Sequence, residues 1–234
     1  AFGHPTWNPC LMRKLLILVF FCVPALATEH PGTDEFVQKA ISEYGLQEAE
    51  VRALLAGAEY KQSIIDAISR PAEGKPWHQY RKIFLTNTRI RQGIAFWKEN
   101  RELIATASEK FGVDEEVIVS IIGVETSYGR ITGSYKTVDA LVTLGFYYPQ
   151  NLSSDRSGFF SKELLQYMQL AAEEGLPVAD VTGSYAGAMG MGQFMPSSYR
   201  EYAVDFDGDG KRDLWRSTPD VVGSVANYLH RHGW

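Results

Sequence analysis

The chain has 234 residues, of which 45% are hydrophobic and 22% charged, a balance typical of a globular protein with a sizeable core. Its formal net charge of -5 argues against a general affinity for nucleic acid, which needs a basic surface. Both cysteines, Cys10 and Cys22, lie near the N-terminus, so we expect no disulfide to hold the fold.

The N-terminus carries the parts of a secretory signal peptide. Basic residues after Met12 precede an apolar stretch over residues 15–24 and an A-x-A cleavage site at 25–27. We therefore expect residues 1–27 to be upstream sequence plus a removable signal; the alternative is an uncleaved anchor. Bulky residues precede Cys22, where a lipoprotein signal needs small ones, so we do not expect a lipid there.

A linker over residues 28–34 leads into a helical region that we place at 35–110. A break with two prolines at 70–76 divides this region, and Phe111-Gly112 closes it. Apolar residues recur there at helical spacing in four segments, which are 34–44, 46–58, 60–69 and one long helix at 88–109.

The remainder, residues 111–234, is a second region in which helical signals again dominate. No stretch of useful length alternates apolar and polar residues, so the predicted class is mainly α, with a small irregular hairpin near 131–135. Helices are expected over 114–128, 137–144 and 161–174, with two more starting at Pro196 and Pro219.

Glu125 is the candidate catalytic residue. It ends an apolar helical run and shares one face with Ile118, Ile121 and Ile122. Burial makes a carboxylate expensive to ionise, so the pKa rises and a proton stays available near neutral pH, as a general acid requires. The alternative is a Glu at the rim of a core helix, paired with a basic neighbour such as Arg130.

A second carboxylate is hard to find. Most glycosidases use two, about 5–9.5 Å apart. Glu116 lies on the same helix, about 13 Å upstream at 1.5 Å per residue, which is too far. Asp139 lies beyond the following turn and stays open as a partner.

Two further motifs suggest binding sites. The glycine-rich stretch 183–196 would let a backbone approach a ligand closely, although such a stretch is more often a plain loop. The DFDGDG run at 205–210 matches the first half of an EF-hand calcium loop, but Arg216 stands where the bidentate Glu should be; a metal-free acidic turn is the alternative. The expected calcium ligands are Asp205, Asp207, Asp209, the backbone carbonyl of Lys211, and Asp220 as the closing carboxylate.

These motifs together resemble one family, the membrane-bound lytic murein transglycosylase B family of Gram-negative bacteria. The resemblance covers nearly all of the chain from about residue 35 onward. The matching segments are VETSYG at 124–129, the stretch 183–198, DFDGDG at 205–210 and GSVANYL at 223–229.

The resemblance implies a lysozyme-like catalytic core at 111–234 with an added N-terminal helical region. It implies cleavage of the MurNAc–GlcNAc β-1,4 bond of peptidoglycan without water, leaving 1,6-anhydro-MurNAc ends. Glu125 would be the sole acid and then the base, since the substrate's C6 hydroxyl supplies the nucleophile. Residues implied to line the sugar groove are Ser184, Gln193, Phe194, Tyr228 and Tyr80.

The family also sets expectations for the surroundings of the protein. Calcium would be structural, no organic cofactor is expected, and peptidoglycan strands are the expected partner of a monomer, with other cell-wall enzymes as further candidates. We expect a periplasmic location, with outer-membrane association open. Family members continue past residue 234, so the core is expected to be C-terminally truncated relative to them. The alternatives are a lysozyme-type hydrolase and a non-catalytic, calcium-stabilised peptidoglycan-binding module.

Overall fold

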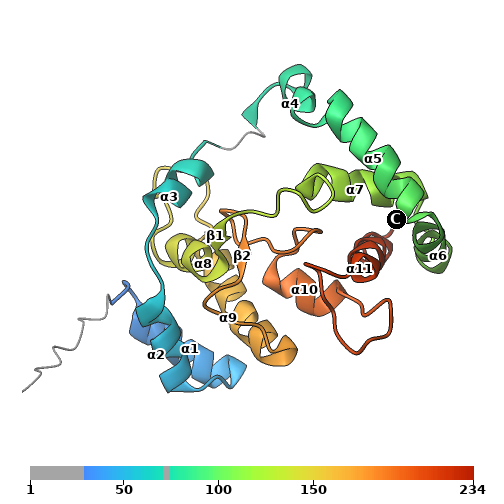
Figure 1. Ribbon diagram of the computed structural model, residues 1–234. Helices are drawn as coiled ribbons and strands as arrows, with labels where there is room; N and C mark the ends of the chain where they lie inside the picture. Colours follow the sequence, from blue (N-terminus) through green and yellow to red (C-terminus); the bar gives the residue numbers. More distant parts are fainter. Residues whose placement is uncertain (1–28, 71–73) are drawn as a thin grey trace, which may run out of the picture.

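The computed structural model describes residues 29–70 and 74–234, so the predicted signal peptide lies outside the described residues. The prediction of a mainly α protein is confirmed, and Figure 1 shows two groups of helices joined through the middle of the chain. The elements are α1 Thr33–Tyr44, α2 Glu48–Gly57, α3 Gln62–Ile68, α4 Trp77–Phe84, α5 Asn87–Glu99, α6 Arg101–Phe111, α7 Glu115–Thr126, β1 Tyr135–Lys136, α8 Thr137–Phe146, α9 Ser157–Glu174, β2 Thr182–Gly183, α10 Pro196–Tyr202 and α11 Thr218–Arg231.

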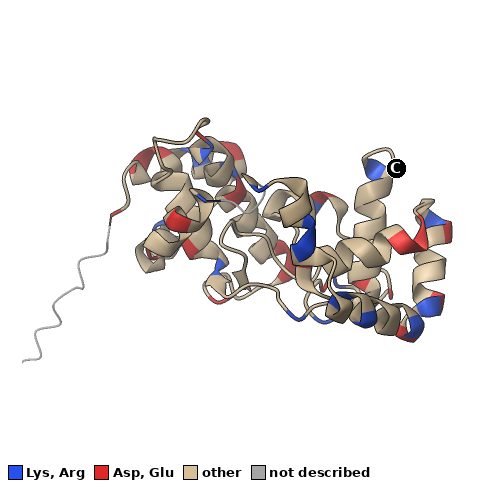
Figure 2. Cartoon of the chain, turned by 90° about the horizontal axis from the view of Figure 1, so that it is seen from above, with Lys and Arg blue, Asp and Glu red and all other residues tan. Residues whose placement is uncertain are grey.

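The core centres on α8, whose residues 137–145 are all buried. A helix that is mostly apolar and buried on every side is stable only when other elements surround it. It packs along α9 and against α3, while α9 also contacts α1 and α10. The second group consists of α5, α6, α7 and α11, with α11 lying against α6 and α7 (Figure 1). Acidic and basic residues are interspersed over the helices of both groups (Figure 2).

The predicted long helix at 88–109 is wrong, because the chain breaks at Asn100 into α5 and α6. Asn100 leaves helical geometry, with φ -111° and ψ 25°, and its side-chain amide donates to the Phe96 carbonyl at 2.8 Å. Asparagine side chains compete with helical backbone bonds in this way.

The sequence pattern gave no sign of α4, which starts directly after Pro76. The fixed φ of proline suits the entry into a helix.

The predicted local hairpin at 131–135 is also wrong. β1 pairs antiparallel with β2, placing Tyr135 opposite Gly183 and Lys136 opposite Thr182. Gly133 has φ +96°, and a Cβ there would overlap the Gly183 carbonyl, so this close approach of two backbones needs glycine. A strand pair between segments so distant in sequence leaves no local signal.

Across the described ranges, no helix combines the length and apolar character needed to span a lipid bilayer.

Candidate active site

Glu125 lines a cavity of about 240 Å³ where three segments meet. The last turns of α7 form one wall, the end of the glycine-rich stretch and the start of α10 form another, and α11 forms the third. Among its described lining residues, Glu125 is the one carboxylic acid. The lining residues are Ile121, Glu125, Gly192, Gln193, Phe194, Met195, Ser198, Val225, Tyr228 and Leu229.

The predicted buried face of α7 is corrected by the structure. Ile118 and Ile122 are fully buried in the core, whereas Ile121 is half-buried and Glu125 is exposed. Ile121 and Glu125 are four residues apart, so they share the part of the helix that faces the cavity. The Glu125 carboxyl therefore meets solvent inside a concave site and does not sit in the core.

The surroundings of the Glu125 carboxyl favour its protonated form, which a general acid needs. The surrounding walls shield the carboxyl from part of the solvent, and this partial burial raises the pKa of Glu125 above its ordinary value. Among the described residues it has no hydrogen bond or ion pair that would stabilise its charge. Arg130, the alternative partner, instead donates from Nη1 to the Ser127 carbonyl at 3.2 Å. The ion-pair interpretation of Glu125 is therefore wrong.

A second carboxylate is missing from the described lining of the cavity. Asp139, left open by the sequence, is buried on α8, where it accepts from the Glu59 amide at 2.9 Å and lies 3.8 Å from the Lys61 amine. Its role is to join α8 to the segment between α2 and α3. Glu116 is exposed on the first turn of α7 and does not line the cavity.

The turn after Glu125 is unusual. Ser127 and Tyr128 both have left-handed backbone conformations, with φ 53° and 62°, which residues other than glycine rarely adopt. Tyr128 inserts its ring between α5 and α7, where Gly93 and Gly123 leave room for it. It also meets Phe96 with ring centroids 5.2 Å apart. Packing therefore maintains the strained turn that ends the acid's helix.

Gln193 and Phe194, two predicted groove residues, reach the cavity. Gln193 has φ 52°, and its Nε2 donates to the carbonyls of Gly190 at 2.9 Å and Thr132 at 3.1 Å. Two carbonyl neighbours fix the amide orientation, so Oε1 is left to accept from a ligand. Phe194 is 7% exposed, and the centroid of its ring lies 5.6 Å from that of Tyr228. Tyr228, also predicted to line the groove, therefore lies at the cavity too.

Ser184 and Tyr80 are not brought to the cavity. The Ser184 hydroxyl accepts from the amides of Ala186 and Ala188, at 3.3 and 3.1 Å, and so shapes the glycine-rich turn. Tyr80 lies on α4 and contacts the rings of Trp77 and Phe84 on its own helix. Their groove roles remain predictions.

Several lining residues were not predicted. Ile121 and Val225 lie one helical turn from Glu125 and Leu229. Helical periodicity had placed Ile121 on the face of Glu125, and the same signal could have found Val225. Met195 and Ser198 sit at the start of α10, and no local pattern distinguishes them from core or loop residues.

The acidic loop is a compact coil around Asp205. Its Oδ1 accepts from the amides of Gly208 and Asp209, at 2.7 and 3.1 Å, and its Oδ2 from Gly210 at 2.8 Å. Oxygens of Asp205, Asp207 and Asp209 lie within 4.8 Å of one another. In the described ranges none of the three forms an ion pair with a basic residue. Three unneutralised carboxylates so close together fit a bound cation.

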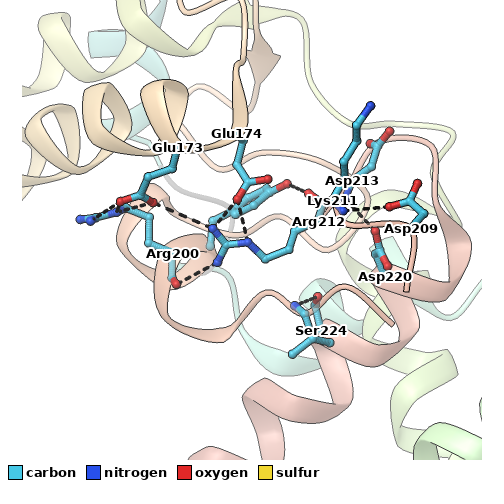
Figure 3. Close-up of polar contacts among 11 residues, drawn as sticks. Glu173, Glu174, Arg200, Asp209, Lys211, Arg212, Asp213, Asp220 and Ser224 are labelled. Carbon is cyan, nitrogen blue, oxygen red and sulfur yellow. Dashed lines mark hydrogen bonds and ion pairs between the residues drawn. The ribbon is translucent and has the colours of Figure 1, made fainter. Parts of the chain in front are cut away.

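Asp220 lies beside this coil but outside the three-acid cluster (Figure 3). It is fully buried, with Oδ1 accepting from the Phe206 amide at 2.8 Å and Oδ2 from the Asp213 amide at 2.7 Å. Burial raises the pKa of its carboxyl, and the nearby Asp207 charge adds to this effect. Asp220 thus ties both ends of the loop to α11. Its role as a calcium ligand remains a prediction, as does that of the Lys211 carbonyl.

A larger cavity of about 500 Å³ lies elsewhere and shares no lining residue with the Glu125 site. Its walls come from residues 174–182 and 211–216. Two of its charged groups have partners of their own. Arg212 pairs with Glu174 (Figure 3), and the Asp213 carboxylate accepts from the backbone amides of Trp215 and Arg216. The smaller cavity is the better active-site candidate because it holds an acid without a partner among the described residues.

A mainly helical fold with one glutamate in a cavity places the protein in the lysozyme-like class. The chain belongs to the transglycosylase SLT domain family, whose model matches residues 28–234.

Known proteins agree with this membership. The chain is 39% identical over 215 residues to membrane-bound lytic murein transglycosylase B of Escherichia coli K12, covering 88% of this chain and 58% of that protein. It superposes on soluble lytic transglycosylase SltB1 from Pseudomonas aeruginosa with TM-score 0.80 and 51% identity, covering 87% and 67% of the two chains. Escherichia coli Slt35 in complex with calcium gives TM-score 0.79 and 39% identity, covering 88% and 64%.

Proposed function

We propose that this protein is a lytic transglycosylase that cleaves the MurNAc–GlcNAc β-1,4 bond of peptidoglycan and leaves 1,6-anhydro-MurNAc ends. The observation that carries the proposal is the solitary carboxyl of Glu125 in its cavity. A hydrolase of the usual kind needs a second carboxylate to activate water or attack the sugar. The similar proteins named above are lytic transglycosylases, one of them acting on murein by its name.

The reaction would use Glu125 twice. The protonated carboxyl gives its proton to the glycosidic oxygen, and the C1–O bond breaks with the electrons leaving on the GlcNAc side. The C6 hydroxyl of MurNAc then attacks the cationic C1, and the Glu125 carboxylate takes its proton. The acid is restored and no water is consumed. The burial that raises the pKa of Glu125 favours the protonated form with which the reaction starts.

The cavity walls support sugar binding. The rings of Phe194 and Tyr228 offer an apolar surface next to the acid. Oε1 of Gln193, for which the described residues supply no donor, offers an acceptor for a hydroxyl or acetamido N–H. Peptidoglycan strands are therefore the proposed partner, and the proposed location is the periplasm, where they lie.

We further propose that the loop at 205–210 binds a structural calcium ion. Carboxylates of Asp205, Asp207 and Asp209 would hold it, with the Lys211 carbonyl and Asp220 as further candidates. The unneutralised acid cluster supports this proposal, as does the calcium complex of Slt35. The ion would stabilise the loop that precedes α11 and take no part in bond cleavage.

Product analysis tests the activity. Sacculi digested with the protein should release muropeptides whose mass is lower by one water than that of hydrolysis products, and borohydride should not reduce their MurNAc ends. Reducible ends would establish the lysozyme-type hydrolase. Binding to sacculi without any release would establish the non-catalytic binding module.

A further inference from the structure

Thr126 follows Glu125 directly and is buried, with 1% of its surface exposed. Its hydroxyl accepts from the Gly129 amide at 2.9 Å and donates to the Met191 carbonyl at 2.8 Å. The Ile122 carbonyl of the same helix is 3.4 Å away. Because a hydroxyl has one proton to donate, the shorter bond to Met191 is the favoured one.

These bonds join separate parts of the cavity. Gly129 closes the strained turn that ends α7, and Met191 directly precedes the wall segment 192–195. The Met191 amide donates in turn to the Leu214 carbonyl at 2.8 Å, which anchors this segment to the chain after the acidic loop. The hydroxyl next to the acid thus links the end of the acid's helix to the wall segment 192–195.

We propose that Thr126 is a positioning residue for the reaction: its hydroxyl fixes the Glu125 carboxyl against the wall formed by residues 192–195. This inference rests on the proposed function, since it assigns Thr126 a share in the rate of that reaction. Thr126 is buried and does not line the cavity, so it acts through Glu125 without touching substrate. Misplacing a catalytic group by about 1 Å can cost about 100-fold in rate.

Valine and serine separate the hydroxyl from the shape of the side chain. Thr126→Val keeps the volume and removes both hydrogen bonds, while Thr126→Ser keeps the hydroxyl. The matched control is Thr143→Val, because Thr143 on α8 is also buried and its hydroxyl also accepts a backbone amide, from Lys61 at 3.0 Å, away from the cavity. Both valine variants leave a backbone amide without its buried acceptor and should lose stability. Thr126→Val should lose more, because the Met191 carbonyl also loses its donor.

We expect Thr126→Val to lower kcat on soluble, uncrosslinked glycan strands about 10- to 100-fold with KM changed less than about threefold. Thr126→Ser should stay within about fivefold of wild type, and Thr143→Val within about twofold, at matched thermal stability. Wild-type kcat in Thr126→Val, or an equal loss in Thr143→Val, would overturn the positioning role.

A second measurement does not depend on activity. In a ¹³C NMR titration, the Glu125 pKa should move toward its ordinary value in Thr126→Val, because the wall separates from the acid, and should stay at the wild-type value in Thr143→Val. Identical titrations in all three proteins would overturn the inference. If the wild-type protein released no glycan product, the proposed function would fail, and this titration would still decide the role of Thr126.

Discussion

A Cβ atom placed on Gly123 would lie 2.6 Å from Cζ of Tyr128, well inside contact distance. The Tyr128 ring cannot retreat, because Gly93 on α5 meets its other side, where an added Cβ would lie 3.1 Å from the same atom. The strained turn behind Glu125 therefore depends on two glycines. This arrangement links the packing of α5 and α7 to the placement of the acid.

Gly123→Ala should destabilise the protein by about 1–3 kcal/mol, the usual cost of overpacking. It should also lower activity, because the turn after Glu125 has to shift. Urea unfolding and sacculus clearance measure the two effects. The control is Gly158→Ala on α9, where a Cβ meets nothing within 4 Å and should be neutral or stabilise by up to about 1 kcal/mol. Equal stability of the two variants would contradict the tight packing of the Tyr128 ring against Gly123.

Glu125→Gln should lower glycan release by at least about 100-fold, since a positioned acid–base group contributes about 10²–10⁴. Folding should persist, because Glu125 has no partner to lose among the described residues. Sacculus turbidity and circular dichroism test both statements. Glu116→Gln, an exposed acid on the same helix, should remain fully active. Substantial release by Glu125→Gln would exclude the acid–base assignment.

The raised pKa of Glu125 predicts a pH dependence of stability with a definite sign. Burial favours the protonated form in the folded state, so the folded protein holds this proton to higher pH than the unfolded chain does. Below the ordinary pKa, Glu125 is protonated in both states and does not lower the free energy of unfolding. As pH rises through the raised value, the unfolded chain has already released this proton, and the free energy of unfolding falls progressively. The difference in melting temperature between Glu125→Gln and wild type should therefore be more favourable to the variant at pH 7.5 than at pH 4. A difference independent of pH would argue against desolvation of this carboxyl.

Calcium should raise the melting temperature, because a ligand that binds only the folded state adds about 2.7 kcal/mol at 100 times its Kd. Scanning calorimetry with calcium and with chelator measures the shift. Asp209→Asn should weaken it, and Asp220→Asn should abolish it if Asp220 is a ligand. The matched control is Asp180→Asn, an exposed acid outside the loop. An unchanged melting curve with added calcium would remove the metal site.

The sequence by itself determined the local features of this protein. Helical periodicity predicted most helices, and the apolar run before Glu125 led to the prediction of this residue as the acid, because both depend on neighbours within a few residues. The acid cluster at 205–210 could be recognised for the same reason: the bonds that its three carboxylates accept from backbone amides of the loop join residues at most five apart.

Only the tertiary structure decided which faces meet. It turned Glu125 from a presumed core position into a cavity wall, separated Ser184 from that cavity, and paired β1 with the distant β2. The union of α7, residues 192–195 and α11 also arises there. These outcomes depend on packing between segments far apart in the chain, where many arrangements satisfy the same local pattern and only the filled core selects one.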